Sequence, residues 1–156
     1  MKRAVTPSSL SAVSWRDTAS AEAQQDLDAL LNMALGFAQL QLAERGGFFP
    51  YAAAIRTDGE PEMIAAQPSQ GEGEHPEPAD ILASCFAALT DKRGHIRAAA
   101  VISDVRTAEA TEAIRIDLEH AEGLALAVLL PYARQKDGKL HYGEIRAGKA
   151  QRQIWG

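Results

Sequence analysis

Hydrophobic and polar residues form short runs through the second half of the chain, from His95 to Trp155, and turn-forming residues separate the runs. This pattern is typical of an antiparallel meander, in which short turns join neighbouring strands. Strands are expected at Ile96–Val105, Ala113–Glu119, Leu124–Ala133 and Lys139–Arg146, with Gln151–Trp155 as a candidate fifth strand. The Ile114–Glu119 stretch alternates cleanly and predicts one buried face. Leu124–Leu130 is apolar throughout and predicts a central strand covered on both faces.

The first half opens with a long stretch of helical periodicity. Apolar residues recur every three or four positions from Leu27 to Leu42, and polar residues occupy the opposite face. Ser20 is a suitable N-cap for this helix, and Gly46-Gly47 is a suitable stop. A hairpin is then expected, with strands in Phe48–Arg56 and Glu62–Ala66 and a turn at Asp58-Gly59.

A second helix is expected from Pro78 to Lys92, after a polar loop at Gln67–Glu77. Pro78 suits the first turn of this helix, and Gly94 suits its end. The helix would bury an apolar stripe formed by Ile81, Leu82, Cys85, Phe86 and Leu89. The pattern therefore predicts a two-layer α+β fold, in which an antiparallel meander packs against two helices in the order α-β-β-α-β-β-β-β.

The length of the chain indicates one domain. A chain of 156 residues buries roughly 68–70% of its extended surface in a single core. Residues 20–156 are expected to form the α+β domain, and residues 1–19 show no period and are expected to form an N-terminal arm. Trp15 in this arm is expected to pack on the domain itself or, alternatively, on a second subunit, because an indole ring is costly to leave in water.

The charge balance excludes some classes of partner. The net charge is −5 and the isoelectric point is about 5.4, which argues against nucleic acid and anionic membranes because both need clustered basic residues. The start Met1-Lys2-Arg3 is followed by Pro7, Ser8 and Ser9 instead of a continuous apolar region, and no stretch supplies the roughly 20 apolar residues of a membrane span. We therefore expect a cytoplasmic protein with no nucleic-acid or membrane partner.

Side chains for covalent or metal chemistry are sparse. Cys85 is the single cysteine, and its place on an apolar helix face would raise the thiol pKa and leave it inert. The chain has four histidines, none close in sequence to another histidine or to Cys85. His120 and His141 would lie on strands about 9–10 Å apart if the strands pair in order. They are a weak alternative for a metal site, so no metal and no cofactor is expected.

A group of charged residues lies on the predicted strands. Its members are Arg97, Asp104, Arg106, Arg115, Asp117 and Glu119. Such residues on neighbouring antiparallel strands commonly form cross-strand ion pairs, which is the favoured interpretation. The alternative is a ligand pocket between the sheet and the long helix. Its rim would be formed by Tyr51, Asp104, Arg106, His120 and Tyr132.

Alanines occupy strand positions that usually carry bulky side chains, notably Ala52–Ala54 and Ala98–Ala100. A surface of small residues allows another layer to approach closely, either the domain's own helix or a partner. Together with Trp15 and Trp155 near opposite ends of the chain, this composition favours a homodimer.

The order helix, hairpin, helix, meander resembles the layout of small ligand-sensing or adaptor domains of the profilin-like and GAF-like kind. The resemblance covers Ser20 to Trp155 and concerns element order, so it carries over no functional residue. We interpret the chain as a non-enzymatic binding or assembly module that acts as a homodimer. A small-molecule sensor would instead have a closed cavity under the Gln67–Glu77 loop with Arg106 or His120 pointing inward. A metal-assisted enzyme would place two or more of four residues on one face within reach of a common point: His120, His141, Asp117 and Glu119.

Overall fold

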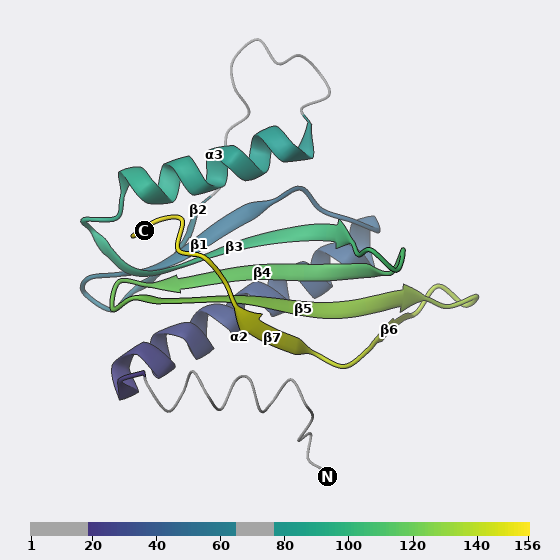
Figure 1. Ribbon diagram of the computed structural model, residues 1–156. Helices are drawn as coiled ribbons and strands as arrows, with labels where there is room; N and C mark the ends of the chain where they lie inside the picture. Colours follow the sequence, from purple (N-terminus) through teal and green to yellow (C-terminus); the bar gives the residue numbers. More distant parts are fainter. Residues whose placement is uncertain (1–18, 65–76) are drawn as a thin grey trace.

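The computed structural model describes residues 19–64 and 77–156, and this part of the chain contains two helices and seven strands. The helices are α2 (Ala21–Arg45) and α3 (Pro78–Asp91). The strands are β1 (Tyr51–Arg56), β2 (Pro61–Ile64), β3 (Ile96–Arg106), β4 (Glu112–His120), β5 (Leu124–Arg134), β6 (Leu140–Tyr142) and β7 (Arg146–Lys149). The α+β class and the predicted order of the elements are confirmed (Figure 1). Residues 1–18 of the predicted arm, with Trp15, and all of the predicted Gln67–Glu77 loop except Glu77 lie outside the described residues.

The sheet is antiparallel throughout, and its strands pair in the order β2-β1-β3-β4-β5. The β1–β2 hairpin turns at Asp58-Gly59 as predicted, with Gly59 at a φ of 93° that a side chain would strain. The meander from β3 to β5 also pairs in sequence order, as predicted.

The segment predicted as one strand at Lys139–Arg146 is two strands, β6 and β7, which both pair with the outer edge of β5. β7 pairs with Leu126–Leu129, and β6 pairs with Tyr132–Arg134. Pro131 stands between these two stretches, and its carbonyl accepts from Gly143 on this same edge. The N–H and C=O of one strand residue point to the same edge of the strand. Proline has no N–H to donate, and Pro131 lies at the position where the partner on this edge changes from β7 to β6.

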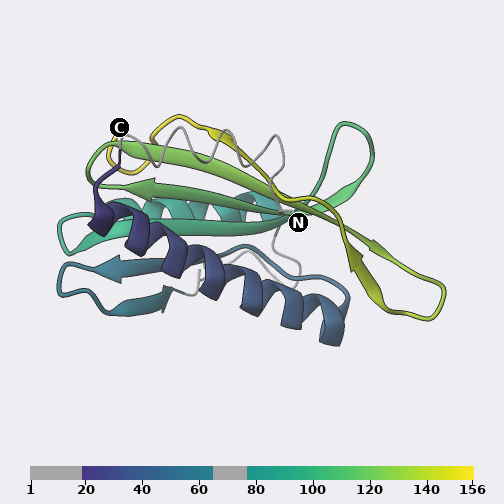
Figure 2. The ribbon, with the colours of Figure 1, turned by 90° about the horizontal axis from the view of Figure 1, so that it is seen from below.

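The two helices lie on opposite faces of the sheet, so the sheet forms the middle of three layers where β1 and β3 run (Figure 1). α2 crosses one face of β1, β3 and β4 (Figure 2). α3 packs on the other face of β1 and β3. The expectation of two layers therefore applies to the outer part of the sheet, which α3 does not reach. For the same reason Leu124–Leu130 is covered well on one face only, which corrects the expected central strand buried on both faces.

Small side chains bring both helices close to the centre of the sheet. Ala53, Ala98 and Ala100 face α2, and Ala52 and Ala99 face α3. All of them are fully buried. The alanine-rich positions are therefore covered by the chain's own helices, which is one of the two readings that the sequence left open.

The C-terminal segment Gln151–Trp155, a candidate strand from the sequence, is an irregular tail that passes over the sheet toward α3 (Figure 1). Three successive backbone N–H groups, those of Gln153, Ile154 and Trp155, donate to the buried carboxylate of Glu119 at 2.6–3.2 Å. Successive N–H groups of an extended strand point to opposite sides, so this convergence excludes a strand here. Ile154 is buried in the core between α3 and the sheet.

Helix α2 begins and ends at the predicted residues. The Ser20 side chain accepts from the N–H of Ala23, and Gly46 ends the helix in the left-handed conformation with φ 79°. Its buried positions recur every three or four residues, from Ala23 to Leu42. Neither helix of the described residues is long and apolar enough to cross a membrane.

Gly36 lies exposed in the middle of α2, and a methyl group added to it would meet no atom within 4 Å. Glycine costs about 0.8–1.0 kcal/mol relative to alanine inside a helix. We therefore expect Gly36→Ala to raise the free energy of unfolding by about 1 kcal/mol in urea denaturation. Gly46→Ala is the control and should destabilise, because alanine is strained at a positive φ. A Gly36→Ala chain no more stable than the natural one would contradict this prediction.

Cys85 is fully buried between α3 and the sheet, among apolar side chains. Burial raises the pKa of its thiol to about 11, so the reactive thiolate is scarce at neutral pH. We expect iodoacetamide at pH 8 to leave Cys85 unmodified in the folded chain. In about 8 M urea, which unfolds the chain, we expect it to modify Cys85 completely. Mass spectrometry measures both; rapid labelling of the folded chain would show that α3 opens readily.

Candidate functional site

A cleft of about 490 Å³ lies at the C-terminal end of α2. One wall comes from the last turns of the helix, and the other comes from the segment that leads into β1. The residues that line it are Phe37, Gln41, Arg45, Gly47, Phe48, Phe49 and Tyr51. Its volume falls within the range of about 300–1,000 Å³ that is usual for small-molecule sites.

Aromatic rings form most of the cleft surface. The Tyr51 ring lies edge to face with Phe37 at a centroid distance of 4.9 Å and with Phe48 at 5.7 Å. The Tyr51 hydroxyl donates to the carbonyl of Ala34 at 2.8 Å, which fixes the ring beneath α2. Phe37 remains 39% exposed and Phe49 58% exposed. The rings of the cleft are therefore held in place and yet accessible to a ligand.

Polar groups that are partly or fully buried hold the loop wall of the cleft. The Asp104 carboxylate on β3 accepts from the backbone N–H of Phe48 and from the Tyr132 hydroxyl, the latter at 2.6 Å. A Cβ on Gly47 would stand 3.3 Å from Asp104 Oδ2, so the loop passes close to this carboxylate. Burial raises the pKa of Asp104, and the two donors oppose that shift. The Asp104–Tyr132 pair thus acts as a support for the loop.

Three of the five residues predicted to rim a pocket therefore lie together at this end of the sheet. Tyr51 lines the cleft, while Asp104 and Tyr132 support its wall. Arg106 is exposed at the end of β3, and the cleft lining does not include it. His120 pairs with Ala98, six residues along β3 from Asp104, which places it about 20 Å away at the other end of the sheet. Neither Arg106 nor His120 lines this cleft, and the Gln67–Glu77 loop, under which a cavity was expected, lies outside the described residues except for Glu77.

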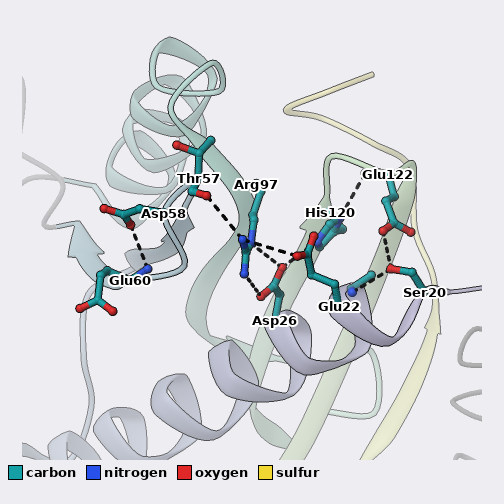
Figure 3. Close-up of polar contacts among 10 residues, drawn as sticks. Ser20, Glu22, Asp26, Thr57, Asp58, Glu60, Arg97, His120 and Glu122 are labelled. Carbon is teal, nitrogen blue, oxygen red and sulfur yellow. Dashed lines mark hydrogen bonds and ion pairs between the residues drawn. The ribbon is translucent and has the colours of Figure 1, made fainter.

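His120 belongs instead to a buried polar cluster at the start of α2 (Figure 3). Asp26, which is 5% exposed, accepts two hydrogen bonds from Arg97, at 2.9 and 3.0 Å. His120 Nε2 lies 3.0 Å from the same carboxylate. Arg97 also approaches Glu22 at 3.7 Å. The cluster joins the helix to β3 and β4.

The hydrogen bonds of His120 determine its tautomer. Nδ1 accepts from the backbone N–H of Glu122 at 3.1 Å, so Nε2 carries the proton and donates to Asp26. Both ring nitrogens are engaged, and the ring is 3% exposed. Glu122 in turn accepts from the Ser20 hydroxyl at the helix N-cap (Figure 3). The cluster therefore positions α2, and a general-base role for His120 has no geometric support here.

The remaining charged residues do not form the favoured cross-strand ion pairs. Arg115 pairs with Asp117 on its own strand, two residues along, at 3.0 Å. Arg97 reaches α2, and the Glu119 carboxylate holds the C-terminal tail. The expectation fails because side chains on one face of β4 reach each other, the helix or the tail as readily as the next strand.

His120 and His141 do not share a metal site. His120 pairs with Leu124 at one end of β5, and His141 pairs with Ala133 at the other. Nine residues of strand separate these positions, which is about 30 Å. In the ranges 19–64 and 77–156, no group of three or more histidine, cysteine or acidic residues is placed to hold a metal ion.

The cleft residues that sequence reasoning missed are mainly those on α2. Phe37 falls outside the buried helical stripe, which is a signal of an exposed aromatic side chain. Phe48 and Phe49 stand in a conspicuous Phe-Phe-Pro-Tyr run with Tyr51. Arg45 gave no signal beyond its place in the last helical turn. Comparison with protein-family models, with curated proteins and with solved structures finds no match to this chain.

The Asp26 cluster yields a prediction about stability. Asp26→Asn keeps the shape of the side chain but removes the charge that Arg97 and His120 contact. Hydrogen bonds to charged groups contribute about 1.5–3 kcal/mol each, so we expect a loss of about 2 kcal/mol in the free energy of unfolding. Glu22→Gln is the matched control, because this exposed carboxylate lies near the same arginine, and its change should stay within about 0.5 kcal/mol. Equal stability of the two variants would refute the anchoring role.

Proposed function

We propose that this chain is a non-enzymatic binding module and that its ligand site is the aromatic cleft at the end of α2. The observation that carries the proposal is the accessibility of Phe37 and Phe49 around one cleft of about 490 Å³. Exposed aromatic rings that converge on a concave surface are typical of binding sites, because a ligand that covers them removes apolar surface from water, which is favourable.

The polar groups of the cleft support binding more than chemistry. Gln41 and Arg45 are the polar side chains on the helical wall. The Tyr51 hydroxyl is already used by the Ala34 carbonyl, and burial raises its pKa. Such groups orient a ligand and discriminate between ligands, whereas proton transfer needs a side chain that titrates near neutral pH. This argument favours the small-molecule alternative of the sequence analysis, at a different place from the one expected.

We also propose that the chain forms a homodimer, and this proposal does not depend on ligand binding in the cleft. The alanines that favoured it are covered by α2 and α3. Leu40 on α2 is 51% exposed and lies one turn from Phe37, so it extends the apolar surface beyond the cleft. This residue is the best candidate in the described chain for a contact with a second copy.

The cleft can be tested with a compact neutral aromatic probe, 2-naphthamide. We expect it to shift the backbone amide resonances of residues 46–49 and of Tyr51 in heteronuclear NMR, because these residues belong to the loop wall. Phe49→Ala should weaken binding about tenfold, since it removes an exposed ring whose contacts are of the order of 1 kcal/mol or more. Met63→Ala is the control, because Met63 is a similarly exposed apolar residue (44%) on β2 and outside the cleft lining. Equal effects of the two substitutions, or no binding, would refute the proposed site.

A further inference from the structure

We propose that the ligand of the cleft is a flat organic anion, an aromatic or similarly apolar body that carries a carboxylate, and that Arg45 binds the carboxylate. This inference rests on the proposed function, because it requires the cleft to be a ligand site. It adds the chemical class of the ligand and the residue that selects it.

The side chains on the helical wall of the cleft become more polar toward the C-terminal end of α2. Phe37, Gln41 and Arg45 follow one another at intervals of four residues, and all three line the cleft. Side chains at this spacing share one face of a helix. Their order is aromatic, amide and cationic, over an axial rise of about 12 Å. A two-ring aromatic acid is of comparable length and has the same order of groups.

The loop wall faces the apolar end of such a ligand. Phe48 packs edge to face against Tyr51, and this contact restrains the Phe48 ring. Phe49 is the more exposed of the two and offers a ring surface that little else in the chain covers. Flat apolar bodies gain from offset and edge-to-face contacts with such rings. The aromatic part of the proposed ligand would therefore lie between Phe37 and Phe49.

Arg45 is suited to the anionic end. Among the described residues, no carboxylate forms an ion pair with it, and the cleft lining contains no acidic residue. Its planar guanidinium can donate two parallel hydrogen bonds to a carboxylate, which a lysine cannot reproduce. The amide of Gln41, one turn earlier, is placed to donate to the same group.

Two carboxylates near the cleft limit the alternatives. Asp104 lies behind the Gly47 loop, where Tyr132 and the Phe48 N–H occupy it. Glu44 is exposed next to Arg45 in sequence, and a step of one residue turns it by about 100° around the helix. Neither is in the cleft lining, so a cationic ligand would meet the arginine and find no acidic partner there.

A matched pair of probes tests the inference. We expect 2-naphthoate, measured by isothermal titration calorimetry at pH 7, to bind at least tenfold more tightly than 2-naphthamide, which has the same rings and no charge. Arg45→Gln should remove this preference and leave the affinity for 2-naphthamide within twofold of the natural chain. Arg45→Lys should retain only part of the preference, because it keeps the charge and loses the planar fork.

Glu44→Gln is the control, since it changes the neighbouring charge outside the cleft and should preserve the preference for 2-naphthoate. Circular dichroism melting of each variant establishes that it is folded. Equal affinities for the two probes in the natural chain, or a preference that survives Arg45→Gln, would overturn the anion assignment while leaving the cleft as a binding site. Failure of both probes to bind would instead overturn the proposed function itself.

Discussion

The close approach of α2 to the alanine-lined centre of the sheet is the constraint on which the rest of this structure depends. Ala34 and Ala38 on the helix and Ala53, Ala98 and Ala100 on the strands are completely buried. An interface of small side chains leaves little room for adjustment, because an added methylene in a packed core typically costs 1–3 kcal/mol. The helix is therefore held in one rotation about its axis. That rotation decides which side chains of its last turns face outward and line the cleft.

Polar side chains of the sheet fix the same helix at both ends and in the middle. Asp26 connects its start to β3 and β4 through Arg97 and His120. The Ala34 carbonyl accepts from the Tyr51 hydroxyl in the middle, and the Leu42 carbonyl near the end accepts from the Arg134 guanidinium on β5 at 3.5 Å. Three of the strand residues that seemed candidates for chemistry, Tyr51, Arg97 and His120, serve this positioning. The hydrogen bonds of Arg97 and His120 are satisfied at the start of α2, and of these three residues only Tyr51 also lines the cleft at the other end.

Local patterns predicted the helices, their caps and the β3–β5 meander because each depends on neighbours in sequence. The division of β6 and β7 at Pro131 and the capture of the tail by Glu119 depend on which edge of β5 is free, which is a non-local property. Tyr51, Asp104 and Tyr132 were named from the sequence as part of a pocket rim, because a few polar groups between a sheet and a helix can orient a ligand; Tyr51 lines the cleft, and the other two lie behind its loop wall. Arg45 and Phe37 were not named, because exposed positions on a helix carry no pattern that separates a ligand site from ordinary surface.

The anion binding proposed for Arg45 is compatible with the acidic character of the whole chain, because electrostatic effects depend on distance. Net charge acts through carboxylates spread over the surface, and at physiological ionic strength their fields decay within about 8 Å. A carboxylate about 4 Å from one guanidinium gains about 4 kcal/mol at an effective dielectric constant of 20, before the cost of removing both groups from water. The half-buried carboxylate of Asp104 accepts from two hydrogen-bond donors and lies behind the loop. The overall charge of −5 therefore disfavours large anionic surfaces such as nucleic acid, whereas the local geometry around Arg45 governs what a small cleft selects.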